Sequence, residues 1–320
     1  MSIACSPIFN SLWSDIDASE TFPGRRPLLA HYTSIGTLER IMSNDEVWLS
    51  HPFCMNDTEE LKFGMIEGAA AFRTHAGVEK ACTTRERFEL LLRGFDHYLR
   101  EFDHEHAFDT YILCLSEHHP EESDGLLSMW RGYGGNGNGA ALVFDLAKLA
   151  VSEKSPFIIS KIFYASSEQR LHWINMKLDE FAQLIASLSI ADDQLHYAAQ
   201  AWLERLKAFA IFTKHQGFQE EREWRIVYWS QRDPRKALGS MFDYSIGPRG
   251  LEPKLKFKVQ HIEGVTTEDL SLEKIVHKII LGPSVSNILT VKTIERMLKK
   301  TGKVALIERL FTSTTPFRSV

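Results

Sequence analysis

The sequence predicts an α+β fold, in which a mixed or antiparallel sheet carries helical insertions. Short β-prone runs recur along the 320 residues and are separated irregularly by helical patterns. The connections between these runs are both short and long, whereas a doubly wound fold alternates strand and helix regularly. No repeat or low-complexity tract divides the chain. We therefore expect a single domain at 28–320, preceded by an N-terminal arm, 1–27, which holds several turn-forming prolines and a glycine.

The first half of this domain opens with a strand, a short helix and a strand, because two β-prone runs flank a stretch with apolar residues at helical spacing. A polar turn at Asn56 and Asp57 then supplies a helix start. A long amphipathic pattern and three further apolar runs follow. We expect strands at 28–34, 47–50, 110–116, 141–145 and 155–165, and helices at 36–42, 58–74, 84–102 and 126–133.

The second half begins with two long helical tracts. In the second tract Leu195, Ala199 and Trp202 recur three and four residues apart, which is typical of a helix packed on a large surface. Further β-prone runs and one more helical pattern complete the chain. We expect helices at 167–188, 193–213 and 284–300, and strands at 221–229, 255–259, 274–282 and 303–310. The helical insertions thus lie at about 58–104 and 167–213.

The composition is that of an ordinary soluble globular protein, with 44% hydrophobic and 25% charged residues. The net charge of −5 gives no general electrostatic reason to bind a nucleic-acid backbone. No apolar run approaches the roughly 18 residues that a membrane-spanning helix needs. The N-terminus lacks a secretory pattern, and the four cysteines are widely spaced, as suits a reducing compartment. We expect a cytoplasmic protein without a membrane segment.

Familiar catalytic signatures such as the phosphate-binding G-x-x-x-x-G-K and the metal-binding H-E-x-x-H are absent. The glycine-rich GGNGNG at 134–139 leads into a strand, whereas a dinucleotide fingerprint must open a helix, so a tight loop is the expected structure. Histidines 104, 106, 118 and 119 lie near acidic residues in polar segments without apolar walls. We interpret these segments as solvated loops and expect no metal site.

Two groups of polar residues are candidates for chemistry. His31, within the first strand, is a polar side chain in an apolar element and needs a partner. Strand alternation would place Glu221, Glu223 and Arg225 on one face, where an acidic pair is costly unless it is exposed or used. The alternatives are a satisfied core histidine and a solvent-facing strand edge on which Arg225 neutralises a glutamate.

Trp130 and Tyr133 lie three residues apart on a short helical piece and could form an aromatic wall. Packing in the core is the alternative role for both rings.

Several motifs in a fixed order resemble a bacterial family known as domain of unknown function 2971. The resemblance extends over roughly residues 28–285, and its specific elements are MW-x-x-Y and E-x-E-x-R. The order is YTSIGTLERIMSNDEVWLS, NDTEE, CLSE, MWRGYGGNGNGAALVF, EREWRIV and IILG.

The chain is also similar, more distantly, to the ADP-ribosyltransferase fold, which has a split β-sheet core. This similarity rests on a first-strand histidine, a short helix, a second strand and a late strand headed by glutamates. It implies that His31 contacts the ribose of NAD, and that Trp130 or Tyr133 holds the nicotinamide. It further implies a catalytic role for Glu223 or Glu221, with Arg225 on the pyrophosphate or holding Glu223. The implied NAD contacts are His31, Tyr32, Thr33, Ser50, Trp130, Tyr133 and Arg225.

The resemblance implies an enzyme that uses NAD as a substrate and cleaves its nicotinamide–ribose bond, in bacterial defence or a stress response. Such an enzyme is either a transferase that modifies a macromolecule or a hydrolase that only splits NAD. A carboxylate near the ribose would stabilise the positive charge that develops on the ring. The alternatives are a non-catalytic nucleotide-sensing module and a protein-interaction module. If the protein cleaves or senses a nucleotide, one cleft is expected to be lined by His31, Tyr133, Glu221 and Glu223.

Overall fold

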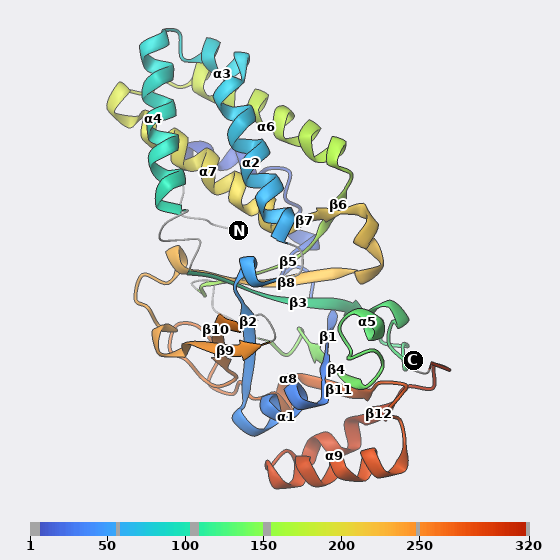
Figure 1. Ribbon diagram of the computed structural model, residues 1–320. Helices are drawn as coiled ribbons and strands as arrows, with labels where there is room; N and C mark the ends of the chain where they lie inside the picture. The colour runs from blue at the N-terminus through green and yellow to red at the C-terminus, as the bar shows by residue number, and fades with distance from the viewer. Residues whose placement is uncertain (1–6, 56–57, 103–108, 150–154, 248–249, 318–320) are drawn as a thin grey trace.

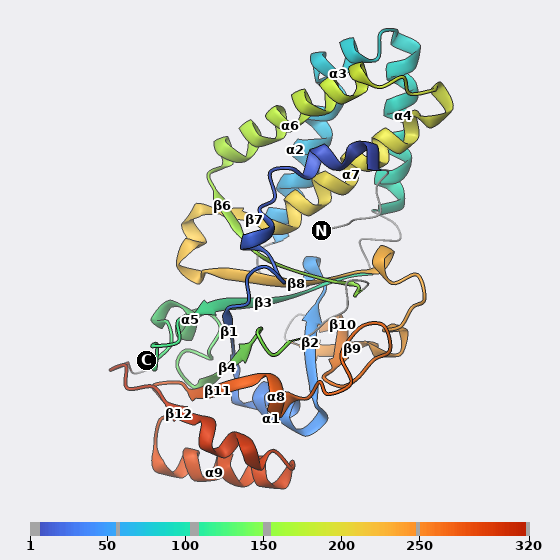
Figure 2. The ribbon, with the colours of Figure 1, turned by 180° about the vertical axis from the view of Figure 1, so that it is seen from behind.

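The computed structural model describes residues 7–55, 58–102, 109–149, 155–247 and 250–317. A ten-stranded, mostly antiparallel sheet lies between a layer of long helices and a set of shorter ones (Figures 1 and 2). The expected combination of a largely antiparallel sheet with several helices is therefore confirmed. Its strands are β1 (Leu28–Ser34), β2 (Glu46–Ser50), β3 (Thr110–His118), β4 (Gly139–Asp145), β5 (Phe157–Lys161), β8 (Glu223–Trp229), β9 (Phe242–Gly247), β10 (Gly250–Lys258), β11 (Val276–Leu281) and β12 (Leu310–Thr312).

Several helices begin at residues suited to capping. The side chains of Ser34, Thr84 and Asn287 each accept a hydrogen bond from a first-turn backbone N–H, and Ser166 forms a reciprocal capping box with Gln169. The α-helices are α1 (Ile35–Asn44), α2 (Thr58–Thr74), α3 (Ala76–Ala81), α4 (Arg85–Glu101), α5 (Leu127–Gly132), α6 (Ser167–Ser187), α7 (Leu195–Phe212), α8 (Leu272–Ile275) and α9 (Ile288–Lys300).

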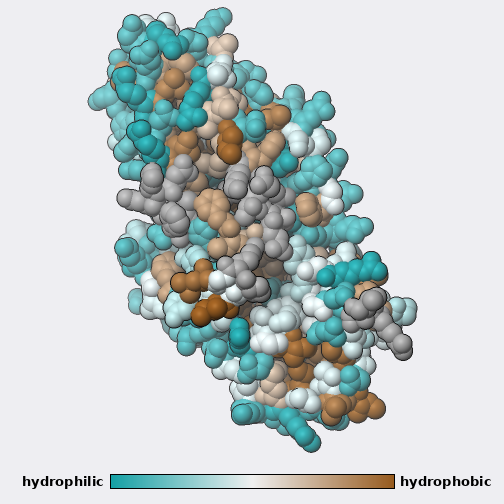
Figure 3. Space-filling model, in the orientation of Figure 1, coloured by the Kyte–Doolittle hydropathy of each residue, from teal (hydrophilic) through white to brown (hydrophobic). Residues whose placement is uncertain are grey.

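Helices α2, α3, α4, α6 and α7 form one layer, which we call the helical layer (Figure 1). Its core includes Phe72, Phe181 and Trp202, whose rings lie in mutual contact and are fully buried. The segment expected as an arm also packs here, because Phe9 and Leu12 of a 3₁₀ helix, η1 (Pro7–Trp13), are buried in the same cluster. Seen as in Figure 3, the surface of this layer is largely hydrophilic.

The middle of the sheet is split along one edge of β3. On its other edge β3 pairs with β8 from Thr110 to Ser116. On the split edge, β1 pairs only with Ser116 and the residues after it, whereas β2 pairs only with Ile112. The intervening backbone of residues 113–115 thus faces an opening between β1 and β2, and this opening positions the site described below.

Two small parallel strands connect the helical layer to the sheet. β6 (Phe163–Ala165) precedes α6, and β7 (Thr213–His215) follows α7 directly. A 3₁₀ helix, η7 (Gln216–Glu221), then leads into β8. The last turn of α7 is consequently brought close to the start of β8, although ten residues separate them.

Most expected elements are present within two to four residues of the predicted bounds, but the strand expected at 303–310 is wrong. This segment is a 3₁₀ helix, η10 (Val304–Arg309), and only the three residues of β12 pair, in parallel, with β11. The backbone N–H of Lys303 donates to Leu298 O, and the Lys303 ammonium pairs with Asp45. These contacts hold Lys303 against the end of α9, and the residues after it do not continue as a strand. The helix start expected at Asn56 and Asp57 lies outside the described residues.

Across the described part of the chain, no helix combines the length and apolar character needed to cross a membrane.

Candidate functional site

A pocket of about 250 Å³ opens at the split in the sheet. Its floor is the exposed edge of β3, and its walls come from β1, β2, β10 and α5 and from the segment that joins β7 to β8. It lies between two hydrophobic clusters on this face of the sheet, since Ile112 belongs to the helical-layer cluster and Met129 to the cluster beneath α5. The sheet opening and the two flanking clusters together create the cavity.

Six of the nine residues predicted as site residues line this pocket, and they come from elements up to 192 positions apart. The expected juxtaposition of His31, Tyr133, Glu221 and Glu223 is therefore observed. Their roles in binding or catalysis stay predictions. The six are His31, Tyr32, Ser50, Tyr133, Glu221 and Glu223.

The remaining three predicted residues do not line the pocket. Trp130 is fully buried, donates from Nε1 to Asp124 O at 2.8 Å and meets Tyr32 edge-on, so it packs in the core and cannot stack on a ligand. Thr33 is also buried, within the pairing of β1 with β4. Arg225 is buried against Glu223 and the helical layer, which removes its guanidinium from any pyrophosphate in the pocket.

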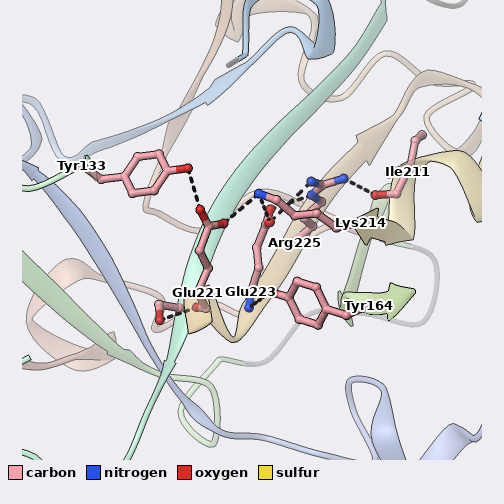
Figure 4. A network of polar contacts seen from close by, with 8 residues as sticks. Tyr133, Tyr164, Ile211, Lys214, Glu221, Glu223 and Arg225 are labelled. Carbon is pink, nitrogen blue, oxygen red and sulfur yellow. Dashed lines mark hydrogen bonds and ion pairs between the residues drawn. The ribbon is translucent and has the colours of Figure 1, made fainter. Parts of the chain in front are cut away.

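A buried lysine, Lys214 of β7, connects the two glutamates (Figure 4). Its Nζ lies 2.7 Å from Glu221 Oε2 and 3.0 Å from Glu223 Oε2, and its side chain is only 2% exposed. Because burying an isolated charge is very costly, the two carboxylates and the ammonium stabilise one another in this position.

Glu223 is the more deeply held carboxylate. Arg225 Nε donates to its Oε1 at 2.7 Å, and the Arg225 guanidinium also donates to Ile211 O at the end of α7. Burial alone would raise the pKa of Glu223, but the charges of Arg225 and Lys214 lower it to about 2. Glu223 is consequently ionised at all physiological pH values, with its oxygens already engaged.

Glu221 occupies a different backbone environment from the one that alternation predicts. It ends η7 and is not part of β8, because Arg222 adopts a left-handed conformation with φ 44° that interrupts the extended chain. The Glu221 carboxylate is partly exposed and also accepts a hydrogen bond from Tyr133 Oη at 3.0 Å. The solvent-facing strand edge considered from the sequence is wrong, since β8 is an interior strand between β3 and β5.

Tyr133 projects toward the pocket although it lies only three residues from the buried Trp130. The α5 helix ends at Gly132, and Tyr133 has non-helical dihedral angles of −129° and −22°. The residue is 38% exposed and lines the pocket.

His31 closes part of the split from the β1 side. Its ring hydrogen-bonds to the backbone of Cys114, one of the residues that neither β1 nor β2 pairs. Burial lowers the pKa of His31 to about 4, against the effect of this bond, so the imidazole is neutral near pH 7. It can therefore offer a neutral polar contact to a ligand but no positive charge.

Two pocket residues carry no signal in the sequence. Lys214 follows an amphipathic helix without any motif, and Lys254 alternates with apolar residues in a strand that reads as an ordinary half-buried one. Only the placement of the elements shows that both ammonium groups reach the same cavity.

Among the described residues, no group of three or more histidine, cysteine or acidic side chains is arranged to hold a metal ion. His118 is not in a solvated loop as expected, because it ends β3 and is buried. His104 and His106 lie outside the described residues. A carboxylate held between an ammonium and a phenol, in an open pocket with an exposed aromatic ring, suits binding and stabilisation of a ligand that is or becomes cationic.

A family model matches part of the chain. Neither the curated proteins nor the solved structures include a match to this chain. The matched region spans α5 to the middle of β8, and so contains Tyr133, Lys214, Glu221 and Glu223 but neither β1 nor β2. It is shorter than the range over which the motifs indicated a resemblance. Residues 129–226 match the family model described as protein of unknown function, DUF2971.

Proposed function

We propose that the pocket binds NAD and that the protein cleaves the bond between nicotinamide and ribose. The observation that carries this proposal is the Glu221 carboxylate, which lines the pocket and is fixed by Lys214 and Tyr133. Cleavage leaves the bonding electron pair on the nicotinamide nitrogen and a positive charge on the ribose ring. Water or a nucleophilic group of a macromolecule then bonds to the ribose C1′ and releases its proton to solvent. A carboxylate fixed beside that ring lowers the energy of the charged transition state.

The geometry gives the two glutamates different roles. Glu223 is 3% exposed, and its carboxylate is occupied by Arg225 and Lys214. We assign it as a positioning residue that holds Lys214. Glu221 is the more exposed of the two and has fewer basic partners among the described residues, so we assign it as the catalytic carboxylate.

The exposed ring of Tyr133 and the neutral His31 complete the proposed site. Tyr133 offers its face to the nicotinamide, since a positively charged pyridinium is attracted to an aromatic face. His31 offers a neutral imidazole to the ribose hydroxyls. A volume of about 250 Å³ lies just below the roughly 300–1,000 Å³ of typical ligand pockets, which fits one half of the dinucleotide better than the whole.

Release of free nicotinamide from NAD tests this proposal. We expect the wild type to release it, and Glu221→Gln to reduce the rate by about 10²-fold, the usual loss when one stabilising group is removed from a charged transition state. Glu220→Gln is the matched control, because Glu220 is adjacent but exposed and does not line the pocket. A Glu221→Gln protein that releases nicotinamide as fast as the wild type would overturn the assignment.

A nucleotide-sensing module is the second candidate, and one observation favours it. The carboxylates are already neutralised by Lys214 and Arg225, which weakens their effect on a developing cation. If calorimetry shows that the wild type binds NAD, and neither the wild type nor Glu221→Gln releases nicotinamide, the result would support sensing over catalysis.

A further inference from the structure

The pocket has a second polar group on the side of β3 away from β8. It consists of Ser50 of β2 and of Glu252 and Lys254 of β10, and all three line the cavity. Lys254 and Ser50 are direct partners in the antiparallel pairing of β10 with β2. Lys254 Nζ donates to Ser50 Oγ at 2.9 Å and to Glu252 Oε2 at 3.0 Å.

This ammonium is positioned by the sheet itself, and its surroundings are largely closed to solvent. The side chains of Lys254 and Glu252 are 11% and 13% exposed. A lysine ammonium has three N–H donors, and two of them point to Ser50 and Glu252 in the part of the chain that the structure describes. The third donor is left for a group that enters the pocket.

Trp48 lies beside this group on the same strand as Ser50 and also lines the pocket. Its ring is flanked by Lys256 Nζ at 4.8 Å and by the Arg40 guanidinium at 5.8 Å. Within the pocket, the β2 and β10 wall therefore presents one ammonium and one carboxylate, Lys254 and Glu252, beside an aromatic ring, whereas the opposite wall presents two carboxylates that share one ammonium. This asymmetry fits a ligand with a cationic end and an anionic end.

We propose that Lys254 and Ser50 bind a phosphate group of the ligand, so that the site takes a phosphorylated nucleotide in preference to the corresponding nucleoside. This inference rests on the proposed function, since it places the phosphate on the wall across from the carboxylate that faces the ribose. Charge-assisted hydrogen bonds from an ammonium and a hydroxyl are a common way of holding a phosphate oxygen. Glu252 opposes this binding, because its carboxylate shares Lys254 and repels the incoming anion.

The opposed charges give a test with effects of opposite sign. Calorimetry would compare NAD, nicotinamide riboside, which lacks phosphate, and inorganic pyrophosphate. We expect Lys254→Met to weaken NAD binding by about 10-fold or more, as for loss of one charge-assisted bond, and to leave the riboside unchanged. Glu252→Gln should tighten NAD and pyrophosphate, and Lys254→Arg should retain most of the NAD affinity. A purely structural ion pair would not produce this pattern.

Lys258→Met is the matched control, since Lys258 lies on the same strand with its side chain 49% exposed. The urea midpoint of each variant shows whether it still folds. If Lys254→Met has lost its fold, the NAD affinity of Lys254→Arg, which keeps the positive charge, tests the inference. Equal binding of NAD and riboside by the wild type would overturn this inference and leave the proposed function intact. Pyrophosphate binding that depends on Lys254, without any NAD binding, would support the phosphate site and overturn the proposed function. If none of the three ligands binds, both are wrong.

Discussion

Replacing Glu223 by glutamine should destabilise the protein by an amount that depends on pH in a defined way. The pKa of Glu223 is lowered from 4.5 to about 2 in the folded protein. A shift of this size corresponds to about 3 kcal/mol of stability at neutral pH. Loss of one partner from a buried ion pair, which leaves Lys214 and Arg225 without this carboxylate, gives an estimate of the same size, about 3–5 kcal/mol.

The sign follows from the direction of the shift. Because the folded-state pKa lies below the unfolded-state value, the contribution of Glu223 is fully present above pH 4.5 and is lost as the pH falls through about 2. The difference between wild type and Glu223→Gln should therefore be the same near pH 7 and near pH 5. At about pH 3.5 it should be smaller by about 1.4 kcal/mol, which corresponds to one pH unit below the unfolded-state pKa.

Urea unfolding at these three pH values, followed by circular dichroism, measures the difference directly. Glu308→Gln is a suitable control, since Glu308 is exposed and its replacement should change stability by less than about 0.5 kcal/mol. A Glu223→Gln protein that loses under about 1 kcal/mol near pH 7 would refute the argument, because the carboxylate would then not be the common partner of the two buried cations. A difference that stays constant between pH 5 and pH 3.5 would refute the pKa shift.

Three further predictions concern the scaffold around the pocket. Gly139→Ala should cost about 1–3 kcal/mol in urea unfolding, because the added Cβ would lie 2.1 Å from Thr33 O in the neighbouring strand. Trp202→Ala should cost about 3–5 kcal/mol in the same assay by leaving a cavity at the centre of the helical layer, and a smaller loss would mean that the layer collapses around it. The ring resonances of His31 should not titrate between about pH 8 and 5.5, since burial lowers its pKa to about 4, and NMR would show a midpoint near 6.5 if the ring were solvated. Its contribution to stability is present above pH 6.5 and declines as the pH falls toward 4.

The sequence was most informative where a periodic pattern coincides with burial. β1 and α7 could be predicted because their apolar residues recur at the spacing of a strand and of a helix, and the structure buries those residues. His31 and the glutamates stood out for a related physical reason, since polar side chains in apolar elements need partners. The same reasoning could not identify those partners, because Lys214 and the backbone of Cys114 are brought to them only by the tertiary fold.

Single backbone conformations account for the errors around the site. Trp130 and Tyr133 would share one face of a regular helix, but α5 ends between them, and one ring enters the core while the other is left exposed. Glu221 and Glu223 would belong to one regular strand, but the left-handed conformation of Arg222 ends the strand between them, so that Glu221 lies in η7 and only Glu223 lies in β8. A non-glycine residue with positive φ is uncommon, and the residues around Arg222 do not predict this conformation.

The position of Arg222 explains why the site depends on the helical layer. The left-handed turn brings Glu221 and Glu223 to the same ammonium, from η7 and from β8. Two carboxylates this close would repel each other, and one would bind a proton unless a fixed positive charge lay between them. That charge is Lys214, the second residue after α7, and the carbonyl of Ile211 in the same helix also holds Arg225 against Glu223. The helical layer therefore leads directly to the cation that both carboxylates contact, as well as covering the sheet. A change in the packing of α7 would move Lys214 and thereby alter its contact with Glu221, the candidate catalytic carboxylate.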